Sequence, residues 1–214
     1  MSFIVFVVFC ICLTFGHGAE TEWWQKPSTQ KRIREERAVI ISINSKSENS
    51  KNYYHMTGAG VVKATPAHTL KKILSFQELE KVSHYFKKVT HQPEYNRVYF
   101  LLEAYGYQAR LLIKYEVLEK DDRTVFLWNV VWGGFQGMIG RVELTGLGGG
   151  SGGDKTQAIL ISRFEDKEIP LPHIFKGFVL EVIVQHVAKS MRAWIEESVA
   201  LEGLKGANKE GLKE

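Results

Sequence analysis

Residues 174–197, IFKGFVLEVIVQHVAKSMRAWIEE, decide the fold of this chain. Wound as a helix, the segment places its apolar side chains on one broad face and its charged and amide side chains on the other. The apolar face carries Leu180, Ile183, Val184, Val187, Met191, Trp194 and Ile195, and the polar face carries Glu181, Gln185, Lys189, Arg192 and Glu196. The pattern predicts a long amphipathic helix over residues 172–197, whose apolar face meets either a packed core or a lined cavity.

Most of the chain before this helix, from about Arg37 onward, has the two-residue period of β-strands. In residues 107–118, one face carries Tyr107, Ala109, Leu111, Ile113, Tyr115 and Val117. Strands are predicted over residues 37–44, 52–63, 84–90, 97–105, 107–118, 124–132, 135–144 and 156–164. The short turns between neighbouring strands indicate an antiparallel meander.

One helical stretch interrupts these strands. Thr65 and Pro66 have the residue types of an N-cap and a first helical position. Apolar residues then recur at helical spacing from Ala67 to about Val82, and a capping-box pattern at Ser75 divides the stretch into two short helices. Because helices and strands occupy separate blocks of the sequence, the fold class is α+β.

The composition is that of an ordinary globular protein. The 214 residues are enough for one domain with a sizeable core, with 44% hydrophobic and 24% charged residues. The formal charge is +4, and the basic residues are interleaved with acidic ones. The chain therefore lacks the basic stripe of a nucleic-acid-binding protein, and no nucleic-acid partner is predicted.

The N-terminal segment has the composition of an export signal. Residues 2–16 carry no charged side chain, which is long enough for the core of a signal peptide and short for a membrane span. Cleavage near Gly18 or Ala19 would remove residues 1–19, and the protein would be periplasmic or secreted. Because no Lys or Arg precedes the apolar run, the alternative is a domain that stays anchored to a membrane by this segment.

Both cysteines, Cys10 and Cys12, lie inside this segment. The mature chain would then have none, which excludes a thiol nucleophile, cysteine-ligated zinc and any disulfide. A bacterial periplasm fits such a chain better than a harsh extracellular setting.

The rest of the chain is predicted to divide into a polar linker at residues 20–36, a folded domain at 37–203 and a disordered tail at 204–214. The linker contains a charge run and the pair Trp23-Trp24. We favour a mobile linker or short surface helix here. The alternative is that the tryptophan pair docks on the domain or at a membrane interface.

In their order along the chain, these segments resemble the START/Bet v1-like superfamily, also called SRPBCC or helix-grip. The resemblance rests on residues 63–68 (KATPAH), Tyr115–Val117, Val125–Trp128, residues 154–156 (DKT) and Met191–Ile195. It covers about residues 53–197 and is similar to polyketide cyclase and lipid-transport members. It implies a curved antiparallel sheet of about seven strands around the C-terminal helix, with two short helices after an early strand. Residues 37–44 would be an added edge strand.

Members of this superfamily leave a tunnel between sheet and helix and bind lipids, sterols, quinones, polyketides or other hydrophobic ligands. We expect this chain to bind a hydrophobic or amphipathic small molecule without transforming it. One alternative is a cyclase, dehydratase or hydrolase that uses Glu103 or His186 as acid or base. Another is an interaction module with a solid core. Ligand exchange or the N-terminal segment offers a route to membrane contact, and the oligomeric state stays open.

The implied tunnel gives candidate roles to side chains of the sheet and the long helix. The ligand-binding candidates are Tyr99, Tyr107, Tyr115, Trp128, Trp132, His186 and Ser190. Large aromatic side chains suit a ligand wall, and they suit a packed core equally well. Trp128 and Trp132 share strand parity and are predicted to face the same side. His186 lies beside the apolar helix face, where it would meet a ligand's polar head or be satisfied by backbone or water.

No metal site and no cofactor are predicted. His84 and His91 are seven residues apart, and the sequence contains neither His-Glu-x-x-His nor His-x-His. The glycine-rich residues 146–154 match a dinucleotide fingerprint and a nucleophile elbow. Both motifs need a helix directly afterwards, whereas residues 156–164 have the pattern of a strand.

Overall fold

The computed structural model describes residues 22–48, 51–148, 153–165 and 173–210. Its strands are β1 Ile40–Glu48, β2 Lys51–Val62, β3 Phe86–Gln92, β4 Arg97–Ala104, β5 Tyr107–Glu119, β6 Thr124–Gly133, β7 Ile139–Leu147 and β8 Lys155–Glu165. Its helices are α1 Pro27–Arg34, α2 Pro66–Ile73, α3 Leu79–Val82 and α4 His173–Glu210, with short 3-10 turns η1 Trp23–Gln25, η2 Phe76–Glu78 and η3 Pro93–Tyr95. The predicted signal peptide lies outside the described residues.

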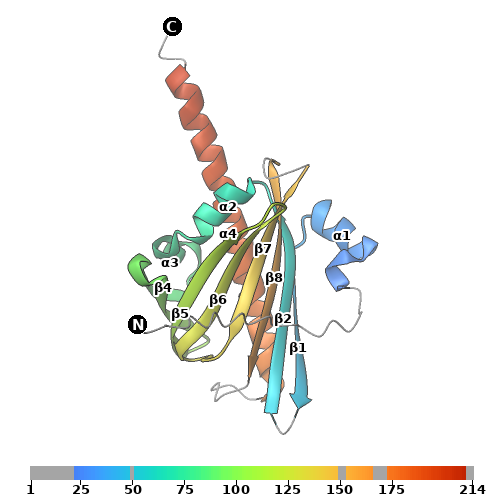
Figure 1. The fold of residues 1–214 in the computed structure, drawn as a ribbon, viewed down its shortest axis with the longest axis vertical. Helices are drawn as coiled ribbons and strands as arrows, with labels where there is room; N and C mark the ends of the chain where they lie inside the picture. Colours follow the sequence, from blue (N-terminus) through green and yellow to red (C-terminus); the bar gives the residue numbers. More distant parts are fainter. Residues whose placement is uncertain (1–21, 49–50, 149–152, 166–172, 211–214) are drawn as a thin grey trace, which may run out of the picture.

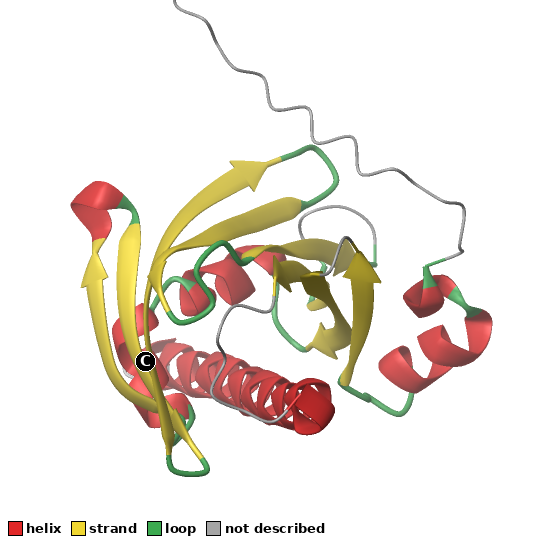
Figure 2. Ribbon diagram, turned by 90° about the horizontal axis from the view of Figure 1, so that it is seen from below, coloured by secondary structure: helices red, strands yellow, loops and turns green. Residues whose placement is uncertain are grey.

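The strands form one antiparallel sheet in the order β1-β2-β8-β7-β6-β5-β4-β3. The sheet curls, and α4 lies in its concave side while α1 lies outside the sheet (Figures 1 and 2). This arrangement is the helix-grip architecture, and it confirms the predicted α+β class. The described sheet has eight strands: about seven are implied by the resemblance, and β1 is the predicted added strand at one edge. The other edge is β3.

The first short helix begins as its sequence indicates, and the second does not. The Thr65 side chain accepts a hydrogen bond from the backbone N–H of His68, at 3.2 Å, and Pro66 is the first residue of α2. The chain does divide near Ser75, but the capping-box prediction is wrong. Ser75 makes no side-chain cap and instead donates to the carbonyl of Lys71, one turn back, at 3.0 Å. A serine hydroxyl has this backbone alternative wherever a helix has just ended.

The segment predicted to be a linker packs on the outer face of the sheet. Trp24 and Ile33 are buried against Ala59 and Val61 of β2. The indole N–H of Trp23 donates to the hydroxyl of Thr57 at 2.9 Å. The docking alternative, rather than a mobile linker, therefore describes residues 22–36.

The polar face of α4 lies along the free edge of β1. Gln185 donates to the carbonyl of Val39 at 3.0 Å, and Glu181 accepts from the backbone N–H of Ile43 at 3.3 Å. Arg192 donates to the carbonyl of Arg37, whose guanidinium pairs with Glu196. An edge strand exposes unpaired backbone groups, so this stripe of α4 side chains holds the helix and covers the edge together.

The helix is also longer than its sequence pattern suggested. It continues to Glu210, through most of the residues predicted to be a disordered tail. Past the sheet it meets α2, where His68 is hydrogen-bonded to Ser198 at 2.8 Å and Lys72 lies over the ring of Trp194 at 4.6 Å. These contacts fix the C-terminal half of α4 at the end of the molecule where α2 lies.

Candidate functional site

A cavity of about 1010 Å³ lies between the concave face of the sheet and α4. It is at the upper end of the roughly 300–1,000 Å³ usual for small-molecule sites. Its apolar lining includes Phe100, Leu111, Ile113, Phe126, Trp128, Met138 and Leu160 from the sheet and Leu180, Ile183, Val184, Val187 and Met191 from α4. The cavity contradicts the solid core on which the interaction-module alternative depends.

One end of the cavity is closed by α2, η2 and the C-terminal half of α4. The lining side chains here are almost completely buried, with exposed fractions of 1% for Thr69, 3% for Phe76 and 3% for Ile195. Thr69, a polar group of this wall, has its hydroxyl hydrogen-bonded to that of Thr156 at 3.4 Å. Thr156 in turn donates to the carbonyl of Ala64 at 2.7 Å. We call this region the blind end.

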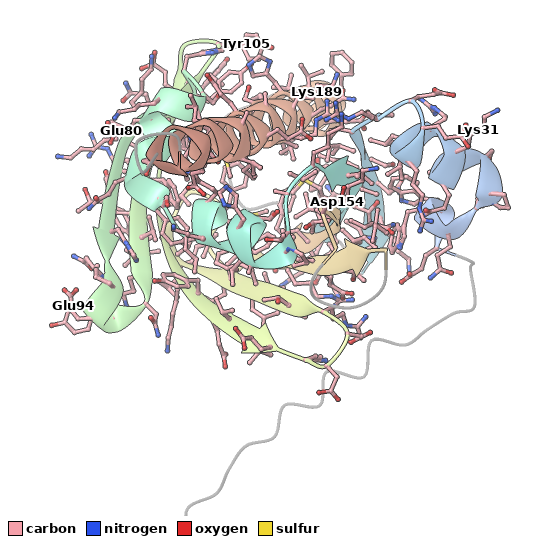
Figure 3. All side chains as sticks on the ribbon, turned by 90° about the horizontal axis from the view of Figure 1, so that it is seen from above. Lys31, Glu80, Glu94, Tyr105, Asp154 and Lys189 are labelled. Carbon is pink, nitrogen blue, oxygen red and sulfur yellow. The ribbon has the colours of Figure 1, made fainter. Side chains whose placement is uncertain are left out.

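The opposite end of the cavity is open and aromatic. Its lining includes Tyr105, Tyr107 and Trp132, whose exposed fractions are 64%, 47% and 53%. Tyr105 and Gly106 form the tip of the β4–β5 hairpin, and both have positive φ, as a tight two-residue turn requires. Figure 3 shows Tyr105 at this tip, away from Glu94, which lies in η3 just before the other end of β4. We call this region the rim.

The rim is also where most of the polar lining side chains gather. The polar lining side chains near the β4–β5 hairpin are Tyr85, Glu103, Tyr105, Tyr107, Gln108 and Arg110. Burial raises the pKa of Tyr85, and a hydrogen bond to the phenol of Tyr105 raises it further. The Tyr85 phenol therefore stays protonated and able to donate a hydrogen bond at neutral pH.

The structure brings three of the predicted ligand-binding residues to the cavity lining, which are Tyr107, Trp128 and Trp132. Trp128 lies over Gly140, which leaves room for its indole ring on the concave face of the sheet. A register shift between Leu112 and Ile113 separates the two tryptophans: Trp128 pairs with Tyr115 and Trp132 with Leu112. This bulge interrupts the strand parity on which the prediction rests. Both side chains nevertheless line the cavity, Trp132 at the open rim.

The other two predicted tyrosines are outside the cavity lining, for different reasons. Tyr115 points to the concave side, but Phe76 and Phe126 pack against its ring and His91 is hydrogen-bonded to its phenol at 2.8 Å. Tyr99 alternates with the buried Val98 and Phe100 and therefore lies on the other face of β4. Ligand-binding roles for these residues stay predictions.

His186 and Ser190 of α4 are outside the cavity lining as well. His186 is exposed and meets the rings of His84 and Tyr85 edge-to-face, with ring centroids 5.7 Å and 5.6 Å away. It is thus next to a rim residue without lining the cavity itself, and its part in binding or catalysis stays a prediction.

Glu103 is held in a surface network. Its carboxylate accepts from Gln108 at 2.9 Å and pairs with Lys87 at 3.6 Å. The hydrogen bond from Gln108, together with the charge of Lys87, lowers its pKa. A carboxyl group with a lowered pKa is ionised at neutral pH, which makes it a poor general acid, and its lowered basicity makes it a weaker general base. This geometry does not favour the enzyme alternative.

Sequence reasoning missed Tyr85 and Tyr105 as rim residues. The available signal was the pair Tyr105-Gly106 between two alternating segments, which is typical of a two-residue hairpin. This signal predicts an aromatic side chain at the end of a strand, but it does not predict that a cavity lies beside that side chain.

Two further features are absent from the part of the chain that the structure describes. No group of three or more His, Cys, Asp or Glu side chains there is arranged to hold a metal ion. Nor does any helix within those residues have the length and apolar character needed to cross a membrane.

Comparison with solved structures places this geometry in a known fold. A START superfamily protein from Mycobacterium smegmatis matches with a TM-score of 0.53 at 13% identity, over 67% of this chain and 97% of that one. A STAR-related lipid transfer protein from Xanthomonas axonopodis matches with a TM-score of 0.51 at 10% identity, over 72% and 98%. A protein from Thermus thermophilus matches with a TM-score of 0.54 at 14% identity, over 67% and 98%.

No protein-family model and no curated protein match the sequence. The structural similarity nevertheless confirms the START/Bet v1-like helix-grip fold. At such low identity it concerns the fold alone, and the function has to be argued from the cavity.

Proposed function

We propose that this protein is an exported helix-grip domain that binds a hydrophobic or amphipathic small molecule in the cavity between sheet and α4 without transforming it. The ligand class would be a lipid, sterol, quinone or polyketide-like compound. The observation that carries the proposal is the volume of about 1010 Å³ with a largely apolar lining. Removing an apolar ligand from water into such a space is favourable roughly in proportion to the area it buries.

The STAR-related lipid transfer protein from Xanthomonas axonopodis, which shares this fold, supports the proposal. So does the state of the titratable groups at the cavity. Glu103, the carboxyl candidate for acid–base chemistry, is already paired with Lys87, and His186 does not line the cavity. A binding role needs neither of them.

Export is proposed from the N-terminal sequence. The uncharged residues 2–16 and the absence of cysteine after Cys12 support a periplasmic or secreted domain, with a membrane-anchored form as the alternative. Mass spectrometry of the mature protein from the exported fraction would identify its first residue. A first residue near Ala19 supports cleavage, and an intact Met1 in the membrane fraction supports the anchor.

Membrane contact during ligand exchange is proposed from the rim. Tyr105, Tyr107 and Trp132 expose large aromatic surfaces beside the opening. Tyrosine and tryptophan are the side chains that favour the membrane–water interface. Co-sedimentation with vesicles would test this, with a Tyr105→Ser/Trp132→Ser variant expected to bind less.

Ligand binding itself is tested by native mass spectrometry of the purified protein, followed by titration with an apolar fluorescent dye. Val187→Trp would place an indole in the cavity, because Val187 lines it near the middle of the apolar face of α4. Ala193→Trp is the matched control, since Ala193 is exposed on the same helix. We expect dye affinity to fall about tenfold or more in the first variant only. A folded protein that carries no ligand and takes up no dye would refute the proposal.

A further inference from the structure

The polar groups that line the cavity are distributed unevenly between its two ends. The rim offers the phenols of Tyr85, Tyr105 and Tyr107 and the amide of Gln108, all open to solvent or near it. The blind end offers the hydroxyl of Thr69, which is 1% exposed and already hydrogen-bonded, and the guanidinium of Arg192, which donates to the carbonyl of Arg37. A ligand would meet these two environments with different parts of its structure.

From this asymmetry we propose that the cavity takes a single-headed amphiphile tail first, with the apolar chain against the blind end and the polar head held at the rim. The inference rests on the proposed binding function and adds the class and the direction of the ligand. It describes a molecule such as a long-chain acid or a lysolipid, with one hydrogen-bonding head and one continuous apolar body.

The blind end disfavours a polar head because its polar groups are already bonded to other parts of the protein. Arg192 donates to the carbonyl of Arg37. Thr69 is bonded to Thr156, and Thr156 donates to the backbone of Ala64. Nearby, His91 and Tyr115 are hydrogen-bonded to each other, and aromatic rings separate this pair from the cavity. A head group brought to this end would lose its water without replacing those hydrogen bonds.

The rim accepts a head group for the opposite reason. Its phenols are donors, and carboxylate, phosphate and carbonyl oxygens are acceptors. Because Tyr105 and Tyr107 are exposed, a head between them keeps part of its hydration shell, so that a charge is tolerated there. The rim carries both signs of charge, Arg110 and the ionised Glu103 that is paired with Lys87, so the phenols rather than a net charge select the head.

The direction of binding is tested with two photoreactive forms of palmitic acid, one with a diazirine near the chain end and one with it beside the carboxyl group. After irradiation, peptide mass spectrometry locates the labels. We expect the chain-end probe to label the blind end, around Phe76, Met191 and Ile195, and the head-proximal probe to label the rim, around Tyr105 and Tyr107. The reverse pattern overturns the inference.

Two variants make the test independent of labelling. Tyr85→Phe/Tyr105→Phe removes two rim phenols and is expected to weaken palmitate about tenfold while leaving an apolar dye without a head group unaffected. Thr69→Val removes the hydroxyl at the blind end and is expected to change palmitate affinity less than about twofold. The opposite ranking of the two variants would also overturn the inference.

The same assays separate this inference from the function on which it rests. Dye uptake without palmitate binding or labelling refutes the amphiphile class and leaves the binding function in place. Failure of both dye and palmitate to bind folded protein refutes both.

Discussion

Gly140 on β7 pairs with Trp128 on β6, and the indole ring of Trp128 occupies the space of a side chain at position 140. A Cβ atom there would lie 2.2 Å from Cζ2 of the ring, far inside contact distance. Gly60 on β2 is a matched control, because its Cβ would meet Cγ2 of Val39 at 3.5 Å, an ordinary contact. Gly140→Ala should therefore push the ring off the sheet and into the cavity, whereas Gly60→Ala should move nothing.

The expected size of the effect follows from two opposing contributions. Replacing glycine by alanine inside a strand stabilises the folded state by roughly 0.5–1 kcal/mol, and Gly60→Ala should show this gain. Overpacking a fitted site costs about 1–3 kcal/mol. Because the gain is common to both variants, Gly140→Ala should be less stable than Gly60→Ala by about 1–3 kcal/mol.

Denaturant unfolding of the two variants measures this difference. Repeating the pair in a Trp128→Leu background removes the ring, and the penalty at position 140 should then disappear in the double-mutant cycle. Gly140→Ala should also bind an apolar dye more weakly than Gly60→Ala, since the displaced ring takes up cavity volume. Equal stability of the two glycine variants, or a penalty that persists without the indole, would refute this reasoning.

Three other predictions concern the parts that surround the cavity. Burial raises the pKa of Glu196, but its bonds to Arg37 and to the backbone of Lys63 more than offset this, so the net shift is downward. The stability that this carboxylate contributes is thus present above its ordinary pKa of 4.5 and is lost as the pH falls through the lowered value. Glu196→Gln should therefore lose less stability on acidification, which urea unfolding at a series of pH values measures. Ile33→Ala should cost about 2–5 kcal/mol by thermal unfolding because Ile33, on α1, is fully buried against β2. Lys31→Ala, at an exposed position of the same helix, should cost almost nothing, and equal effects would mean that α1 does not dock. Glu103→Gln should leave dye and palmitate affinities unchanged, and a marked loss would show that this carboxylate takes part in the site.

The sequence predicted the fold class because long periodic segments carry most of the information. The apolar stripe of α4 and the alternation of β5 indicate their elements without any tertiary knowledge. The polar stripe of α4 was different, because Glu181 and Gln185 have the same pattern whether they face water or a strand edge. Only the position of β1 in the folded sheet decides between these two environments.

The candidate site was predictable only as far as strand parity holds. Parity divides β4 into two faces, but Tyr99 and Phe100 could not be assigned to the inner or outer face without the fold. The bulge in β6 adds one residue to the alternation between Trp128 and Trp132 and has no clear sequence signal, so parity alone could not place Trp132 at the cavity. Tyr115 was assigned to the correct face, yet the packing of Phe76 from η2 screens it, and that contact joins residues far apart in the sequence.

The apolar side chains of α4 that line the cavity are the same ones that pack the helix against the sheet. Among residues 177–202, whose side chains the structure describes, Ile195 is the one that is fully buried, while Leu180, Ile183 and Val187 are half-buried because they face open space. A fully buried leucine or isoleucine side chain contributes about 1.5–3 kcal/mol to the stability of the fold. Part of this contribution is missing at each of the three half-buried positions. A bound apolar chain would supply the absent contacts, and at a hundredfold excess over its Kd it would stabilise the fold by about 2.7 kcal/mol. The uncovered apolar face of α4 lowers the stability of the empty protein. A ligand that covers this face explains its apolar side chains more simply than an interaction module that works through its outer surface.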